Sequence, residues 1–541
     1  MKLLKLKLIG RYKGLSDQTF DFSEASGNEI AFIGLNGSGK SQLLELIAEI
    51  FSYLEREKRR DFKVRKTLPF KFMIEFRTGD EINLDAQNTY KLEFHDRDNI
   101  SAFIFLDGNW QRHLFENTPL PNYVVGYASG LNENLQRAFL KNALQYFDIM
   151  AIRAARRKLL SGSVNEENVE RINHDYSRRY PHIFDAVNAD NRLSLRESDT
   201  TIPSTIFLDY DCNALLMASL ALLSEEVLDE LFPDIPFHYP SKIVIRYDLR
   251  NTSVEEDTIR DVKQLIREVG DDAVKGLCKK SSDKVFEIYE LDYLSADITI
   301  DFTSVNLKGR LNNIYYEDPL QLFQKLYKIQ LLGVKHWQVA DKKNLRNDAF
   351  DGNVKKPLKS KLPLSVVEMK LSNGQQEIDF DDLSDGEAQL IQVLGAARIF
   401  KNKHTLFLLD EPETHLNPSW RTNFHRYLIH AMDGYDQAQV VLSTHSPFLI
   451  SSLKKENVFR FERSNSRTEM LPIASETFGA SFDVLIKKYF SLQSTISQSA
   501  VVEILAHLND QTLTDLERSQ WINEHVGESM EKAYLLRKLS S

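Results

Sequence analysis

The sequence predicts an α/β fold in which a large, mostly helical insert interrupts a head of parallel strands. An apolar run at 30–33 passes directly into a glycine-rich loop and then into a strongly periodic helix at 41–59. Two further apolar runs, at 405–409 and 439–443, end abruptly in polar residues. Short continuous apolar runs are typical of strands buried on both faces, which parallel α/β sheets contain. Helical periodicity dominates between 135 and 364.

Length and composition limit the classes of protein. A chain of 541 residues is long enough for about three domains. Its 42% hydrophobic and 27% charged residues are those of an ordinary globular protein. The formal charge of −10 argues against a surface coated with nucleic-acid-binding cations, although one basic groove stays compatible with it. Two cysteines, Cys212 and Cys278, exclude a disulfide framework and a multi-thiolate zinc site.

The sequence predicts no segment that spans a membrane. Lysines alternate with leucines over residues 2–9, which breaks any signal-peptide apolar core and favours a half-exposed strand. The longest apolar stretch, 214–223, is much shorter than the ~20 residues that cross a bilayer. We therefore expect a cytoplasmic protein with no membrane contact.

Changes of pattern along the chain predict four parts. Helical stretches, including 258–277, alternate with strands such as 285–302 inside the insert, and a lysine-rich linker is expected at 342–361. After 364 the alternation of strand and helix resumes, with an Asn-Gly turn that is typical of a hairpin. The expected parts are a first half of the head at 1–134, the insert at 135–364, a second half of the head at 365–481, and a helical tail at 482–541, a candidate docking element for a partner.

The glycine-rich loop fits the phosphate-loop pattern between a strand and a helix. Its glycines allow backbone amides to point at phosphate oxygens, and the following helix directs its positive end at the same anion. Lys40 adds a charge for the β- and γ-phosphates, and the hydroxyl of Ser41 is a ligand for Mg²⁺. The predicted nucleotide contacts are Gly34, Leu35, Asn36, Gly37, Ser38, Gly39, Lys40, Ser41 and Gln42.

Two carboxylates follow the strand at 405–409. The carboxyl edge of a parallel sheet is where ligands bind, so Asp410 and Glu411 are expected beside the phosphate loop. Asp410 would hold Mg²⁺ together with Ser41. Glu411 would orient and deprotonate the attacking water.

The segment Leu-Ser-Asp-Gly-Glu at 383–387 precedes a helix and is followed by the Asp-Glu pair and by His445. Taken alone, this segment is also a plain helix-capping box. The order of the motifs resembles that of ABC ATPases, in which Ser384 and Gly386 would belong to the signature motif and His445 to the switch. The resemblance implies that Lys40, Glu411 and His445 are catalytic, and that ATP and Mg²⁺ are the cofactors. It also implies a homodimer, or a higher oligomer, in which each signature caps the ATP of the partner.

The chain departs from the ABC pattern at several positions. Asp385 and Glu387 replace the glycine and glutamine of the usual signature, and Asn417 stands where transporters commonly carry aspartate in the D-loop. The Q-loop glutamine has only weak candidates, Gln87 and Gln111.

The segments at 410–416, 443–449 and 476–481 resemble the defence-associated branch of this family. That branch includes the overcoming-lysogenization-defect nucleases and PtuA, the ATPase subunit of Septu and Septu-like retron anti-phage systems. The tail lacks the clustered carboxylates of a two-metal nuclease. The resemblance to PtuA implies a separate HNH nuclease subunit and, in the retron version, a reverse transcriptase with its RNA–DNA.

One alternative stays open at this point. A RecF-like repair clamp would hold duplex DNA in its ATP-bound dimer and needs a basic stripe, to which Arg153, Arg156, Arg157 and Lys158 are candidate contributors. A standalone nuclease is disfavoured by the missing metal ligands, and a transporter motor by the long insert.

Overall fold

The fold is described from a computed structural model in which Met1–Phe478 and Gly479–Ser541 form two compact units. The described residues are those outside 64–67, 80–86, 97–98, 130–132, 163–164, 190–191, 198–199, 251–255, 280–290, 348, 351, 353, 356–360, 402–403, 434–436, 465–466, 491–495 and 540–541. Within them, no helix is long and apolar enough to cross a membrane.

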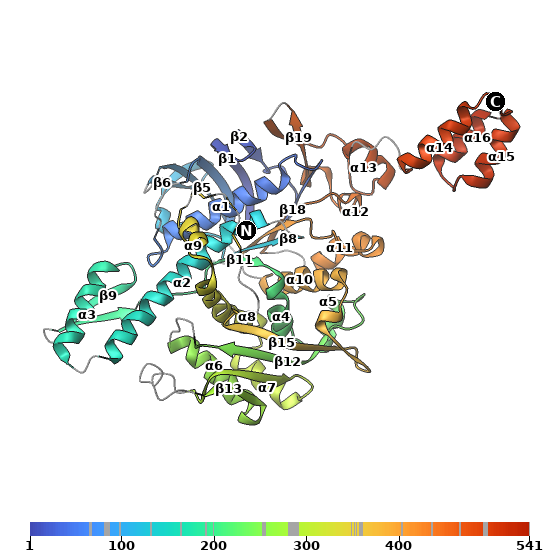
Figure 1. Ribbon diagram of the computed structural model, residues 1–541. Coiled ribbons are helices and arrows are strands. Elements are labelled where there is room, and N and C mark those ends of the chain that lie inside the picture. The colour runs from blue at the N-terminus through green and yellow to red at the C-terminus, as the bar shows by residue number, and fades with distance from the viewer. Residues whose placement is uncertain are drawn as a thin grey trace. The chain divides into compact units, whose positions relative to one another are not determined.

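The first unit is organised around a seven-stranded sheet with the order β11-β8-β17-β18-β3-β19-β20 (Figure 1). The first six strands in this order are parallel, and β20 is antiparallel to β19. The bounds in that order are Thr205–Leu208, Tyr123–Ala128, Thr405–Asp410, Gln439–Ser443, Glu29–Gly34, Val458–Ser464 and Arg467–Pro472. Every residue of β3, β17 and β18 is buried, as expected for strands covered on both faces.

Helix α1 (Lys40–Lys58) follows β3 and packs against β3, β17 and β18. It begins after Gly39, whose φ of 104° leaves the helical region, and Leu43, Leu44 and Ile47 are fully buried. Its last turn carries Arg56 and Lys58, which complement the negative end of the helix. The expected strand, loop and helix are therefore present, and the α/β fold class is confirmed.

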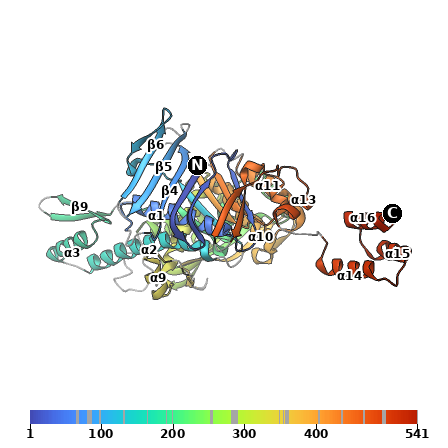
Figure 2. The same ribbon diagram turned by 90° about the horizontal axis from the view of Figure 1, so that it is seen from above.

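A six-stranded antiparallel sheet, β2-β1-β4-β5-β6-β7, shares a hydrophobic core with the parallel sheet (Figure 2). In β1, Leu3, Leu6 and Leu8 are buried while the lysines between them are partly or fully exposed. The rings of Phe72 and Phe94 stack at 5.3 Å across β4 and β5. The bounds of β1, β2, β4, β5, β6 and β7 are Lys2–Tyr12, Leu15–Asp21, Lys71–Gly79, Gln87–Asp96, Asn99–Leu106 and Asn109–His113.

Strands as well as helices build the region expected to be the insert. An antiparallel sheet with the order β13-β14-β12-β15-β16 joins strands from this region to strands that follow it, and β11 joins the parallel sheet. The five strands, in that order, are Val274–Lys279, Tyr293–Asp301, Tyr239–Asp248, Leu364–Ser372 and Glu377–Asp379. Helices α4 to α9 span Tyr210–Leu220, Glu225–Leu231, Glu256–Val269, Val305–Ile314, Pro319–Leu331 and Val339–Leu345.

Three expectations within this region need correction or restriction. The helix predicted at 258–277 is wrong in its second half, because Gly270 adopts a φ of 100° after α6 and the chain then enters β13. The strand predicted at 285–302 lies partly outside the described residues, and its described part is β14. Much of the expected linker also lies outside them, while 342–345 belong to α9.

Helix α2 (Glu133–Ser161) carries an arm that extends from the head (Figure 2). The arm consists of the end of α2, helix α3 (Glu166–Arg179) and the hairpin of β9 (Phe184–Ala189) and β10 (Arg192–Glu197).

Glu197 of the arm faces three arginines of α2. Its carboxylate lies 3.9 Å from Arg153, 3.6 Å from Arg156 and 3.6 Å from Arg157. Arg153 and Arg156 are only 4% and 8% exposed. Arg153 and Arg156 are therefore held inside the arm, whereas Arg157 is half-buried and Lys158 is exposed.

The remaining elements of the first unit lie close to the motifs. Helix α10 (Asp385–Phe400) packs against α4 and α11 (Pro418–Ala431), and the short α12 (Pro447–Ile450) packs against α11. A 3-10 turn, η6 (Phe380–Asp382), leads into residue 383.

The second unit consists of helices, in agreement with the predicted helical tail. Helices α13 to α16 span Phe482–Tyr489, Gln498–Asn509, Asp515–His525 and Met530–Leu539. Lys487 of α13 pairs with Glu531 of α16 at 3.4 Å. The rings of His507 and Trp521 stack at 3.8 Å between α14 and α15.

Replacing Glu197 with glutamine is expected to destabilise the first unit by about 1–3 kcal/mol, because two buried arginines lose their counter-charge. Urea unfolding measures the free energy, and hydrogen exchange should locate the loss in α2 and the β9–β10 hairpin. Glu170→Gln, at an exposed position of α3, is the matched control. Equal stability of the two variants would contradict the assignment.

Candidate nucleotide site

Four parallel strands end at one edge of the central sheet and bring the predicted motifs together. The phosphate loop follows β3, and Ser129 follows β8. Asp410 is the last residue of β17 and Glu411 comes directly after it, while His445 follows β18. Adjacent parallel strands point the same way, so residues more than 400 positions apart in sequence become neighbours. This edge is where α/β sheets bind ligands.

The backbone conformation of the phosphate loop requires glycine at several positions. Gly34, Gly37 and Gly39 have φ values of 143°, 75° and 104°. A Cβ on Gly34 would lie 2.4 Å from the carbonyl oxygen of Phe461, and one on Gly39 would lie 2.7 Å from a methyl carbon of Thr468. Strand β19 and strand β20 therefore close directly over the loop.

Other predicted loop residues point in different directions. Ser38 is buried, whereas Leu35 is 54% exposed and Asn36 is exposed. The side-chain oxygen of Gln42 accepts a hydrogen bond from the Gly14 amide at 3.1 Å, so Gln42 ties α1 to the turn between β1 and β2.

Lys40 is buried at the centre of the site. Its ammonium donates to the carbonyl oxygen of Gly34 at 3.0 Å and lies 2.9 Å from Nε2 of His445. Burial lowers the pKa of Lys40 to about 8, against the opposing effect of the Glu411 and Asp410 carboxylates. An anionic ligand beside Lys40 would restore the preference for the charged form.

One oxygen of Asp410 joins the end of β17 to the end of β18 and to the start of α1. This oxygen, Oδ1, accepts hydrogen bonds from the hydroxyls of Ser41, at 2.8 Å, and Ser443. Asp410 is only 4% exposed. Hydroxyl and carboxylate oxygens are hard donors of the kind that Mg²⁺ prefers, so Ser41 and Asp410 fit a magnesium ion held with substrate phosphates.

Glu411 occupies a backbone conformation that residues other than glycine rarely adopt, with a φ of 52°. Its amide donates to the carbonyl of Ser443 at 3.1 Å. Its carboxylate lies 3.5 Å from Nε2 of His445 and accepts from the Thr414 hydroxyl at 3.3 Å. The side chain is 37% exposed, which leaves it open to a water molecule.

His445 lies between the ammonium of Lys40 and the carboxylate of Glu411. Burial and the charge of Lys40 lower the pKa of His445, while Glu411 and Asp410 oppose the shift. The imidazole is therefore neutral at physiological pH and has one ring nitrogen able to accept and one able to donate a hydrogen bond.

Ser384 and Gly386 lie at the start of α10, apart from the phosphate loop. Ser384 caps the helix, and Glu387 completes the capping box by accepting from the Ser384 amide at 2.8 Å; the same carboxylate also accepts from the Ser384 hydroxyl at 2.7 Å. Among the described residues, no hydrogen bond links Ser384 to the loop at 34–41. The exposed Asp385 and the capping Glu387 are both favourable in the first turn of a helix, which explains these departures from the usual signature.

The segment after Glu411 packs against α10. A Cβ on Gly386 would lie 2.9 Å from the carbonyl oxygen of His415. The buried Gln389 accepts from the His415 amide and donates to the Tyr127 hydroxyl, both at 2.9 Å. Asn417 caps α11 by accepting from the Trp420 amide at 2.9 Å, a role that asparagine and aspartate share.

Sequence reasoning missed four residues of this edge: Ser129, Gln389, Glu413 and Thr444. The Ser129 amide donates to the Asp410 carbonyl at 3.0 Å, and its hydroxyl donates to Thr414 at 3.1 Å. The position of Ser129 directly after a strand was a usable signal.

The two glutamines considered for the Q-loop lie instead in β5 and β7 of the antiparallel sheet.

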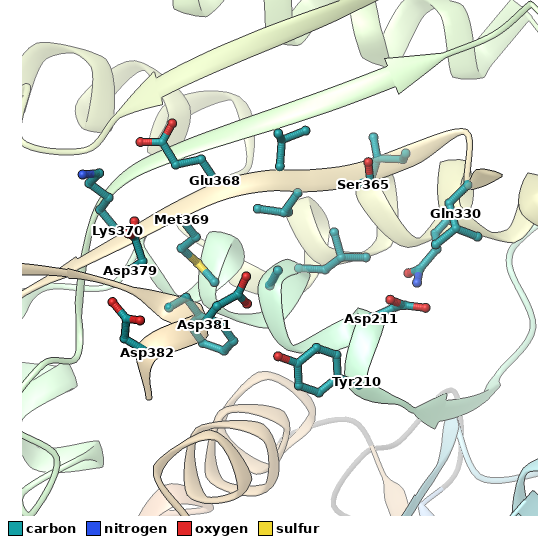
Figure 3. A pocket seen from close by; sticks show the side chains of 17 residues that line it. Tyr210, Asp211, Gln330, Ser365, Glu368, Met369, Lys370, Asp379, Asp381 and Asp382 are labelled. Atoms are coloured by element: carbon teal, nitrogen blue, oxygen red, sulfur yellow. The ribbon is translucent and has the colours of Figure 1, made fainter. Parts of the chain in front are cut away.

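A separate cavity of about 500 Å³ lies beside η6, between β15 and α4 (Figure 3). No predicted catalytic residue lines it. Its polar lining is mainly acidic, with Lys370 as the basic member, and the carboxylates come from Asp211, Glu368, Asp379, Asp381 and Asp382. The cavity adjoins the segment that leads into Ser384.

Comparisons with known proteins agree with an ATPase domain. Residues 285–451 match the family described as "AAA domain, putative AbiEii toxin, Type IV TA system". This stretch contains the Ser384, Asp410, Glu411 and His445 segments. The match does not include the phosphate loop at 34–41.

Two curated relatives match short stretches. Protein ea59 of Escherichia phage lambda is 29% identical over 115 residues, which cover 21% of this chain and 22% of the relative. Retron Vc95 probable ATPase of Vibrio cholerae serotype O1 biovar El Tor is 27% identical over 124 residues, which cover 21% of this chain and 24% of the relative. The matched stretches thus span less than a quarter of either relative.

Solved structures with similarity include SMC heads. A head bound to the C-terminal winged-helix domain of ScpA has a TM-score of 0.33 at 11% identity and covers 87% of this chain and 98% of that one. The SMC head domain from Thermotoga maritima has a TM-score of 0.31 at 11% identity and covers 88% and 100%. The fold assignment rests on the strand order and the loop geometry described above.

Replacing Gly34 with alanine is expected to cost at least about 2 kcal/mol of unfolding free energy, because the new methyl meets backbone that cannot move aside. Gly37→Ala is the control, since a Cβ there meets nothing within 4 Å and only the φ penalty of about 1–2 kcal/mol applies. Urea unfolding measures both. A smaller loss for Gly34→Ala than for Gly37→Ala would contradict the close approach of β19.

Proposed function

We propose that the chain is the ATP-binding and ATP-hydrolysing subunit of a Septu-like or retron-associated anti-phage system. Two heads would sandwich two ATP molecules, and the dimer would control a separate HNH-type nuclease. The observation that carries the ATPase part is the convergence of Lys40, Ser41, Asp410, Glu411 and His445 at one edge of the sheet. The similarity to the retron ATPase supports the defence context.

The residues divide the chemistry between them. Amides of the phosphate loop and the Lys40 ammonium bind the β- and γ-phosphates, and Ser41 and Asp410 hold Mg²⁺, which neutralises phosphate charge when bound. Glu411 accepts a proton from water as the water oxygen bonds to the γ-phosphorus and the bond to the β-phosphate oxygen breaks. His445, beside both Lys40 and Glu411, donates to the γ-phosphate or the attacking water.

The location of the signature supports the proposed dimer. The Ser384 backbone lies at an exposed helix N-terminus, which favours anions. Since Ser384 makes no bond to its own phosphate loop among the described residues, we infer that it serves the ATP of a second copy across a two-fold axis. The RecF-like alternative is weakened, because Arg153 and Arg156 are buried against Glu197.

The Glu411→Gln variant is expected to hydrolyse ATP about 10²–10⁴-fold more slowly while still binding it, because the amide cannot take the proton. Phosphate release measures turnover, and mass photometry with ATP and Mg²⁺ should detect an accumulated dimer. Glu24→Gln, at an exposed position away from the edge, is the control. Unchanged turnover in Glu411→Gln would exclude Glu411 as the base.

The purified chain is expected to assemble with a nuclease-like protein encoded beside its own gene, and to cleave no nucleic acid alone. Mass photometry of the chain mixed with its genomic neighbours measures this. If the chain ignores its neighbours but dimerises on duplex DNA, with an affinity that falls steeply with salt, the repair clamp replaces the defence proposal.

A further inference from the structure

Glu413 is a buried carboxyl that lies two residues beyond Glu411 and outside the chemistry assigned above. It is 4% exposed. One oxygen, Oε1, accepts a hydrogen bond from the hydroxyl of Thr444. The other oxygen, Oε2, is buried and has no hydrogen-bond partner among the described residues. A buried carboxyl with one unsatisfied oxygen is costly, so packing alone does not account for it.

Thr444 connects this carboxyl to the segment that carries His445. The Thr444 hydroxyl donates to Glu413 and accepts from the Ser446 amide at 2.8 Å. Its own amide donates to the carbonyl of Phe32 at 3.0 Å, and its side chain is fully buried. The residues before and after His445 are thus both fixed through one hydroxyl.

The side-chain bond between Glu413 and Thr444 joins the same two segments as a backbone hydrogen bond nearby. The Glu411 amide already donates to the Ser443 carbonyl. Together the two bonds join the segment 411–413 to the segment 443–446 on either side of the pair formed by Glu411 and His445. That pair is separated by 3.5 Å, a distance that a small shift of either segment would change.

The geometry points to Glu413 as a positioning residue that acts through Thr444 to hold His445 at working distance from Glu411 and Lys40. This inference rests on the proposed ATP hydrolysis and assigns a further part of that same site. Glu413 acts as a hydrogen-bond acceptor, so the acceptor oxygen matters more than the charge.

The electrostatic surroundings of Glu413 are consistent with this role. Burial raises the pKa of Glu413 to about 7, and the neighbouring Glu411 adds to the shift, while the hydrogen bond from Thr444 and the charge of Arg421 oppose it. The folded state therefore binds a proton more tightly than the unfolded chain between about pH 4.5 and 7, so this group lowers stability as pH rises through that range. A neutral acceptor of the same shape, as in Glu413→Gln, should therefore raise the free energy of unfolding above that of the wild type at alkaline pH.

Two matched pairs of variants test the inference in the full-length chain. Thr444→Val removes the hydroxyl and keeps the shape, whereas Thr444→Ser keeps the hydroxyl. Glu413→Leu removes the acceptor, whereas Glu413→Gln keeps it and removes the charge. We expect kcat for ATP to fall at least about tenfold in Thr444→Val and Glu413→Leu and to stay within about threefold of wild type in Thr444→Ser and Glu413→Gln. The double variant Thr444→Val/Glu413→Leu should be no slower than the slower single variant.

Two readouts separate positioning from a structural defect. Binding of a fluorescent ATP analogue should stay within about threefold of wild type in all variants, because the phosphate loop is untouched. The melting temperature of Glu413→Gln should exceed that of wild type at pH 8 and match it at pH 4.5. Wild-type kcat in Thr444→Val, or parallel losses of kcat, binding and melting temperature in Glu413→Leu and Glu413→Gln alike, would overturn the inference. Absence of turnover in the wild type would instead overturn the proposed function, and the inference with it.

Discussion

A single oxygen, Oδ1 of Asp410, ties together the elements on which the site depends. It accepts from Ser41 at the start of α1 and from Ser443 at the end of β18, while the backbone of Asp410 closes β17 and accepts from Ser129 after β8. Three strand ends and the start of α1 are thereby held in one arrangement. Because the group is buried, each of these bonds is made in surroundings where an unpaired carboxylate would be costly. The same oxygen is a ligand suited to Mg²⁺, so the order of this edge and the holding of a metal depend on the same atom.

The second half of the head is built as a connected block around α10. Gly386 allows the backbone near His415 to approach the helix, and Gln389 fixes that approach by bonding both to His415 and to Tyr127 of β8. The helix whose first turn carries Ser384 is therefore bonded to the chain just beyond Glu411. A molecule that binds the exposed first turn of α10 therefore contacts a helix that is hydrogen-bonded to the catalytic edge.

Patterns that depend on local sequence were sufficient to predict the edge of the sheet. The apolar runs before Gly34, Asp410 and Ser443 identify buried strands, and the direction of parallel strands brings their ends together. What local patterns could not supply was pairing between distant segments. Strand β12 pairs with β15 after a long separation, and β11 joins the central sheet from within the region expected to be an insert. Likewise, Glu413 and Thr444 look like ordinary loop residues until the fold buries them against each other.

Helix α2 has 29 residues and begins four positions after Ser129, which is bonded to Asp410. At 1.5 Å per residue it is about 43 Å long. Its first part packs on α1, β8 and β11, whereas its far end carries α3 and the β9–β10 hairpin, which is held by Glu197 and by the pair of Asp185 with Arg60. A rigid rod anchored at one end magnifies any rotation of its base, and a tilt of about 5° over this length displaces the far end by about 4 Å. The arm is thus the place on the head where a small rearrangement beside Asp410 would have its largest reach.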